Sequence, residues 1–124
     1  MNFAAGSLLA QVKPAVTTAV TLYTAVLRTE ITLFLAVVIP GSAGNIDIDI
    51  YHDDDGTTYD DSTLIGSIQR ADNADGLTFQ AQCPGSGIMI ARGGTIGVKI
   101  STADDINFSM YGITESLAAD RLRT

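Results

Sequence analysis

Residues 46–51 read IDIDIY. Isoleucine alternates with aspartate, so an extended backbone places the apolar side chains on one face and the carboxylates on the other. Two later stretches, IGVKI at 96–100 and INFSMY at 106–111, alternate in the same way. This period of two is typical of strands that cover a core on one face and meet water on the other. The sequence therefore predicts half-buried β-strands.

Further segments rich in β-branched and apolar residues predict more strands. These segments are 17–24, 28–39, 64–68, 77–81 and 88–91. Turn segments rich in Gly, Pro and Asp separate them, among them DDDGT at 53–57 and DNADG at 72–76. No amphipathic helix interrupts the series, so parallel βαβ units are not expected. About eight strands in this order predict an all-β, antiparallel β-sandwich with jelly-roll-like topology.

The length and composition predict one folded domain. The chain has 124 residues, of which 46% are hydrophobic and 17% charged, and this balance argues against disorder. We expect an N-terminal arm over 1–12, the sandwich over 13–114 and a short C-terminal tail over 115–124. No basic residue precedes Lys13, and the longest apolar run is far shorter than the roughly 20 residues of a membrane-spanning helix. A soluble protein without a signal peptide is therefore expected.

The charge balance restricts the class of partner. Seven Lys and Arg residues oppose fourteen Asp and Glu residues, which gives a net charge of −7. Nucleic acids and anionic membranes are bound by clustered Lys and Arg, so neither is an expected partner. The single cysteine, Cys83, excludes an internal disulfide and is interpreted as a small buried hydrophobe.

The strand predicted over 28–39 is apolar on both faces. Leu33, Leu35 and Val37 alternate with Phe34 and Val38, and a sheet with one solvated face does not produce this pattern. Either the strand is central and covered on both sides, or one face contacts another subunit. The candidate interface residues come from this strand and from the two ends of the chain. They are Leu8, Leu9, Phe34, Val38, Arg121 and Arg123.

Nine acidic residues gather between Asp47 and Asp75, where Arg70 is the single base. Clustered carboxylates bind Ca²⁺, and Asp53, Asp55 and Asp60 are the candidate ligands. The spacing does not match an EF-hand loop. The competing interpretation is a solvated hairpin loop whose aspartates cap their own turns. A third possible use is electrostatic, with an acidic apex that faces a basic partner or keeps particles apart.

The sequence predicts no enzyme and no cofactor. His52 is the only histidine, and no serine elbow accompanies it. Gly93 and Gly94 are followed by neither Lys-Ser/Thr nor a helix, so they are interpreted as a hairpin turn rather than a phosphate loop. Four tyrosines allow a sugar-stacking platform, although packing in the core or in an interface is the favoured interpretation.

Three segments together resemble a family of small structural proteins from tailed bacteriophages. The first is TLYTA at 21–25 followed by RTEIT at 28–32, where Val26 replaces the proline of the family pattern. The second, IDIYHDDDGTTYD at 48–60, resembles the family's hairpin closely. The third is IGVKI at 96–100 followed by INFSMYG at 106–112, which resembles a closing pair of strands. The resemblance spans most of the chain.

The resemblance implies a β-sandwich component of the virion. The expected role is that of a capsid decoration, or cement, protein on the outer capsid surface. Its expected partners are the major capsid protein and further copies of itself in a homotrimer. One alternative is a tail or fibre module that binds host-surface glycans, and another is a Ca²⁺-dependent lectin-like domain.

Overall fold

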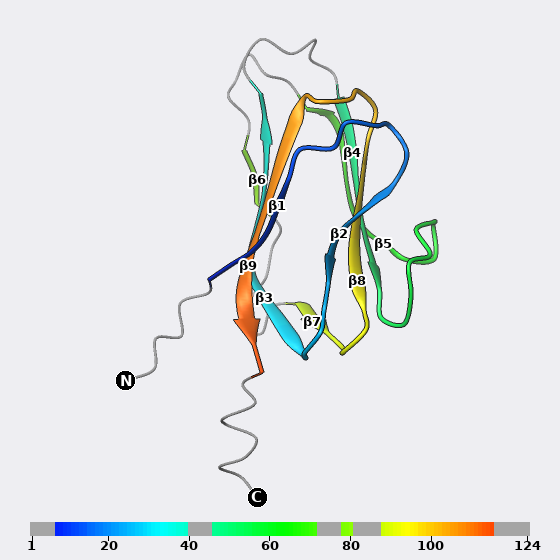
Figure 1. Cartoon of the computed structure of the whole chain (residues 1–124). Helices are drawn as coiled ribbons and strands as arrows, with labels where there is room; N and C mark the ends of the chain where they lie inside the picture. The colour runs from blue at the N-terminus through cyan, green and yellow to red at the C-terminus, as the bar shows by residue number, and fades with distance from the viewer. Residues whose placement is uncertain (1–6, 40–45, 72–77, 81–87, 116–124) are drawn as a thin grey trace, which may run out of the picture.

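The computed structural model describes residues 7–39, 46–71, 78–80 and 88–115. Two antiparallel sheets pack face to face as a β-sandwich (Figure 1). The first sheet contains β1 (Ser7–Val12), β3 (Thr29–Val38), β6 (Thr78–Gln80), β7 (Ile88–Ile90) and β9 (Ile106–Thr114). The second sheet contains β2 (Val20–Thr24), β4 (Ile46–Asp53), β5 (Leu64–Ala71) and β8 (Thr95–Ile100). The all-β class and the antiparallel sandwich are confirmed, and the described residues include no helix long and apolar enough to cross a membrane.

The strand pairing is nested, as in a jelly roll. The first strand pairs with the last, β2 pairs with β8, β3 pairs with β6 and β7, and β4 pairs with β5. The order is β1-β9-β3-β6 in one sheet and β2-β8-β4-β5 in the other. Because β6 and β7 both pair with β3, the nine strands of the described residues fill the eight positions of the roll. The expected jelly-roll topology is therefore confirmed.

The core lies between the inner faces of the two sheets. Phe34 of β3 and Phe108 of β9 meet edge to face, with ring centroids 6.1 Å apart. Isoleucines from both sheets surround this pair and are also fully buried: Ile31, Ile46, Ile48, Ile90, Ile96, Ile100 and Ile106. Each side chain of this kind contributes roughly 1.5–3 kcal/mol on burial. The IDIDIY stretch thus supplies the core of β4, as its alternation predicts.

A β-bulge in β3 decides which residues of this strand face the core. The register with β9 shifts between Ile31 and Leu33, so the alternation changes phase. Thr29 and Ile31 point inward before the bulge, and Phe34, Ala36 and Val38 point inward after it. Phe34 is 1% exposed and Val38 3%, so both were wrong as interface candidates. Leu33, Leu35 and Val37 occupy the outer face instead.

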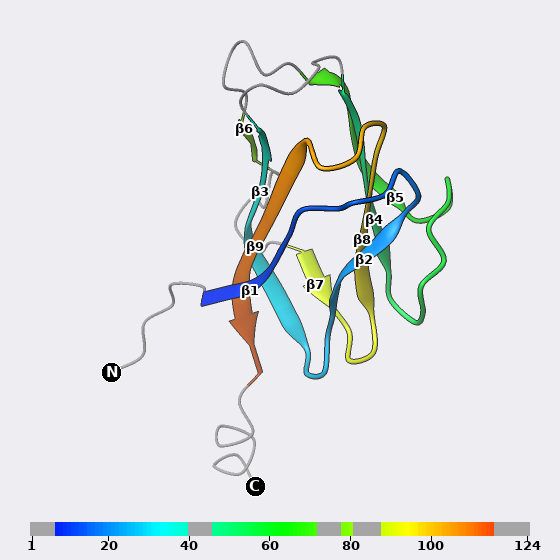
Figure 2. The ribbon, with the colours of Figure 1, turned by 45° about the horizontal axis from the view of Figure 1, so that its top comes forward.

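The first strand begins earlier than the sequence indicates. Residues 7–12 form β1, which pairs with β9 at the edge of the first sheet (Figure 2). Residues 7–12 therefore belong to the sandwich and not to an arm that precedes it. A register shift between Leu8 and Ala10 breaks the alternation of SLLAQV, which explains why the sequence pattern did not indicate a strand there.

Candidate functional site

The outer face of the first sheet carries a group of apolar side chains, with the polar side chains of Gln11, Asn107 and Ser109 beside them. Tyr111 of β9 lies between Leu8 of β1 and Leu33 of β3 in the register, so the three side chains form one row across the sheet. The row beside it places Ile113 of β9 opposite Glu30. We call this surface the apolar face, and its members are Leu8, Leu33, Leu35, Val37, Met89, Tyr111 and Ile113. All seven are exposed or half-buried.

Only some of the interface residues predicted from the sequence lie on the apolar face. Leu8 lies on the apolar face and is half exposed. Leu9 is half-buried and packs against the core, close to Gly112 of β9. Arg121 and Arg123 lie outside the described residues. The strand over 28–39 is central in its sheet, and none of the described strands packs across its outer face.

The outer face of the second sheet is polar and is partly covered by the connection from β4 to β5. Figure 2 shows this connection, residues 54–63, as the green loop outside the second sheet. Its Tyr59 ring lies directly over Gly97 of β8, where an added Cβ would stand 2.6 Å from the ring. Tyr59 also packs beside Tyr51 of β4, with ring centroids 5.7 Å apart. We call this surface the polar face.

A chain of hydroxyl groups fixes the Tyr59 ring. Its hydroxyl donates to Thr95 Oγ1 at 2.8 Å, and Thr95 Oγ1 donates to the carbonyl of Gly56 at 2.6 Å. The Tyr59 hydroxyl lies 2.8 Å from Thr21 Oγ1 of β2, which is placed to donate to it. Hydrogen bonds in such a chain polarise one another, so the ring is held in one position.

The aspartates of the acidic loop are engaged with their own backbone. Asp53 Oδ1 accepts from the N–H of Asp55 at 3.1 Å, and Oδ2 accepts from the N–H of Thr58 at 2.7 Å. These backbone hydrogen bonds lower the pKa of Asp53. The pKa of Asp55 is raised, because its side chain hydrogen-bonds with Asp53 and the two negative charges repel each other.

The neighbouring acids of the loop are held in a similar way. Asp54 Oδ1 accepts from the N–H of Ala91 at 2.8 Å and lies 3.1 Å from His52 Nε2, and the Ala91 bond is the main cause of the lowered pKa of Asp54. Asp60 Oδ1 accepts from the hydroxyl and the N–H of Ser62, in that order of effect, and these bonds lower the pKa of Asp60.

The proposed calcium ligands are thus taken up by the turn. Asp53 and Asp60 bind different backbone groups, and no three His, Cys, Asp or Glu side chains of the described residues are placed to hold a metal ion together. The self-capping interpretation agrees with the observed hydrogen bonds. Cys83 lies outside the described residues.

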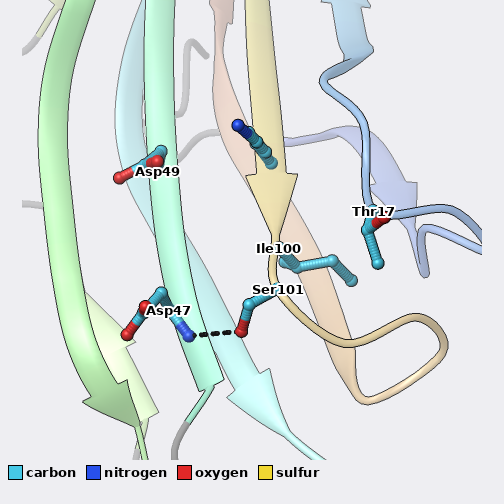
Figure 3. Close-up of a pocket in the computed structure, with 6 residues that line it drawn as sticks. Thr17, Asp47, Asp49, Ile100 and Ser101 are labelled. Atoms are coloured by element: carbon cyan, nitrogen blue, oxygen red, sulfur yellow. Dashed lines mark hydrogen bonds between the residues drawn. The ribbon is translucent and has the colours of Figure 1, made fainter.

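Two hollows lie side by side on the polar face. The larger has a volume of about 520 Å³ and is lined by Tyr51, Tyr59, Asp60, Asp61, Ser62 and Lys99. The smaller, of about 200 Å³, is lined by Thr17, Asp47, Asp49, Lys99, Ile100 and Ser101. Figure 3 shows the smaller hollow, in which the N–H of Asp47 donates to Ser101 Oγ at 2.8 Å. Lys99 lines both hollows and connects them.

The residues of these hollows were only partly indicated by the sequence. Tyr51 and Tyr59 belong to the tyrosines considered for a sugar platform, and the structure brings these two together. Lys99 and Gly97 were not singled out. A signal was available, because both occupy outward positions of the alternating stretch IGVKI.

Burial and the carboxylate of Asp49 determine the state of the Tyr51 hydroxyl. Burial is the larger cause and the negative charge of Asp49 the next, and both raise the pKa of Tyr51. The hydroxyl therefore stays protonated at neutral pH. Lys99 is directly opposite Asp49 in the register, yet it forms no ion pair with any described residue. Its ammonium group is available to a ligand.

Neither a protein-family model nor a curated protein matches this chain. The fold itself defines the class, which is a jelly-roll β-sandwich with one apolar and one polar outer face.

Proposed function

We propose that this chain is a virion structural protein that decorates and cements the capsid of a tailed bacteriophage. The observation that carries the proposal is the apolar face. Contiguous apolar patches on a soluble monomer are usually small, and larger ones mark association surfaces. Jelly-roll sandwiches occur in viral capsids and in lectins, so the fold is compatible with the role without assigning it.

In the proposed arrangement, the apolar face forms the contact between copies in a homotrimer. A trimer fits the local three-fold points of a shell, where each copy contacts its two neighbours through two different parts of its surface. The C-terminal Arg121 and Arg123 contact the major capsid protein. The acidic loop at 53–61 faces solvent on the opposite side. Many weak contacts, summed over the trimer, hold neighbouring shell subunits together against internal pressure. The role needs no catalysis and no cofactor.

Two double variants with matched exposure test the trimer contact. Leu8→Gln/Ile113→Gln changes residues of the apolar face that are 50% and 39% exposed. Ile65→Gln/Leu64→Gln changes residues of the second sheet that are 47% and 39% exposed. Light scattering should give about three times the chain mass for the wild type and for the second variant, but the single-chain mass for the first. Equal masses for all three proteins would contradict the trimer contact.

A shell experiment tests the cement role itself. Capsids stripped of this protein should rupture at a lower temperature than capsids to which the wild type has been added back. Arg121→Gln/Arg123→Gln should remain trimeric and fail to bind the shell. If decorated and stripped capsids rupture at the same temperature, the cement function is wrong even where the trimer is correct.

A further inference from the structure

We propose that the polar face binds a neutral oligosaccharide along β8, with the Tyr59 ring as the stacking platform and Lys99 at the centre. This site goes beyond the proposed decoration role. It lies on the opposite face from the proposed trimer contact. If no sugar binds there, the proposal for the trimer contact is unaffected.

The stacking platform is the first requirement of such a site. Sugar C–H groups pack on aromatic rings, because the ring face is electron-rich. Tyr59 and Tyr51 both line the larger hollow, and the chain of hydroxyl groups with Thr21 and Thr95 fixes the Tyr59 ring. A ring that is already fixed loses little conformational freedom when the ligand binds.

The polar groups around the ring match the hydroxyls of a sugar. Asp61 and Ser62 are exposed on the rim and offer acceptors, since the Ser62 hydroxyl already donates to Asp60. Lys99 offers three donors and forms no ion pair with the described part of the chain. A few convergent polar groups beside aromatic side chains are typical of small-molecule sites.

The arrangement favours a chain of sugars over a single ring. The larger hollow lies around Tyr59, which covers Gly97, and the smaller hollow extends to Ser101 (Figure 3). Residues 97 to 101 span about 13 Å of extended strand, which is longer than one sugar ring. Lys99 lies at the middle of this path, within reach of a ligand that occupies both hollows.

The charges of the two hollows exclude an anionic sugar. Among the described residues, the carboxylates of Asp49, Asp60 and Asp61 line them, against the ammonium group of Lys99. This surplus repels sialic and uronic acids. It also attracts cations, so a basic peptide is the competing ligand. Lys99 lines both hollows and forms no ion pair with a described residue, so its positive charge opposes a basic peptide that spans them.

An NMR titration of the ¹⁵N-labelled full chain tests the proposal. The probes are maltotriose, cellotriose, mannotriose and triacetylchitotriose, with sialyllactose as the anionic sugar and trilysine as the basic peptide. At least one neutral trisaccharide should bind with a millimolar Kd and shift amides within 59–62 and 97–101. No shift with any neutral sugar overturns the proposal. Binding of only sialyllactose or only trilysine overturns it as well.

Substitutions at Lys99 in the centre and at Asp61 on the rim test where the sugar binds. Lys99→Gln should weaken binding of the active trisaccharide about fivefold, the effect of one lost hydrogen bond. Arg92→Gln removes an exposed positive charge in the β7–β8 turn, at the other end of β8, and should leave the Kd unchanged. Asp61→Asn is a second, independent variant and should also weaken binding. Wild-type affinity in both Lys99→Gln and Asp61→Asn, or an equal loss in Arg92→Gln, overturns the assignment to this face.

Discussion

The two outer faces of this sandwich differ in how much of each is covered by the described part of the chain. On the polar face, the connection from β4 to β5 returns to the sheet and places Tyr59 over Gly97. On the apolar face, Leu33, Leu35 and Val37 remain at the surface, and none of the described strands crosses them. A face that the chain covers itself contributes to folding. An apolar face that the described strands leave open is buried by a second copy in the proposed trimer.

The largest expected effect comes from Gly97→Ala. The added Cβ would stand 2.6 Å from the Tyr59 ring, so the ring must leave its position and the hydroxyl chain is lost. We expect a loss of about 1–3 kcal/mol in the free energy of unfolding, the range for overpacked sites. The measurement is urea unfolding followed by circular dichroism.

Gly66→Ala is the matched control for Gly97→Ala. It lies on β5 of the same sheet, where an added Cβ would meet Ile50 at an ordinary 3.9 Å. Its effect should stay within about 0.5 kcal/mol. If the two alanine variants lose the same free energy of unfolding, then the packing of Tyr59 on Gly97 does not stabilise the fold.

Tyr59→Phe should have a smaller effect, because it removes only the hydroxyl group. Thr21 and Thr95 lose a partner, although Thr95 still donates to the Gly56 carbonyl. We expect a loss of about 0.5–1.5 kcal/mol in the same unfolding experiment. Tyr111→Phe, on the apolar face, is the comparison, since that hydroxyl makes no hydrogen bond with a described residue. A larger loss of unfolding free energy in Tyr111→Phe than in Tyr59→Phe would contradict the stabilising role of the Tyr59 hydroxyl.

Acid should destabilise the polar face through its capping aspartates. The pKa values of Asp53, Asp54 and Asp60 are lowered on folding, so the folded state binds fewer protons than the unfolded state near the ordinary value of 3.8. Their contribution to the free energy of unfolding is therefore complete above that pH. It is lost as the pH falls through the lower pKa values of the folded state. The raised pKa of Asp55 opposes this trend in part.

Asp53→Asn tests the contribution of Asp53 to this pH dependence. The amide nitrogen cannot accept from an N–H group, so one of the two backbone bonds is lost at every pH. We expect the variant to be less stable than the wild type at pH 7. The difference should shrink as the pH falls to 3, measured by urea unfolding. A difference that stays constant with pH would show that the carboxylate charge of Asp53 does not matter.

The sequence predicted the strands of the jelly roll because their alternation is local. All eight expected stretches contain a strand, and the IDIDIY isoleucines lie in the core. The missed features depend on a register shift or on a distant contact. The bulge after Ile31 reverses the phase of β3, and its position depends on pairing with β9. No pattern within 28–39 shows that shift.

The candidate site was less predictable for a related reason. Tyr59 and Gly97 are far apart in the sequence, and only the return of the loop onto β8 brings them together. The motif DDDGTTYD indicated a self-capping turn, which the Asp53 and Asp60 hydrogen bonds agree with. It did not indicate that the turn would hold a ring over a neighbouring strand. A glycine at an outward position of a strand is the available signal for such a close approach.

The smallest expected effect on folding comes from Ile113→Gln, and it distinguishes the two faces most directly. Ile113 is at the surface of the single chain, so at low protein concentration its replacement should change the free energy of unfolding by less than about 0.5 kcal/mol. At high concentration the wild type should melt at a higher temperature, because association stabilises the folded state by mass action. Ile113→Gln should lose that concentration dependence, whereas Leu64→Gln, with the same 39% exposure on the second sheet, should keep it. A wild-type melting temperature that does not change with concentration would mean that the apolar face stays uncovered in solution. The two faces would then differ only in how they contribute to folding.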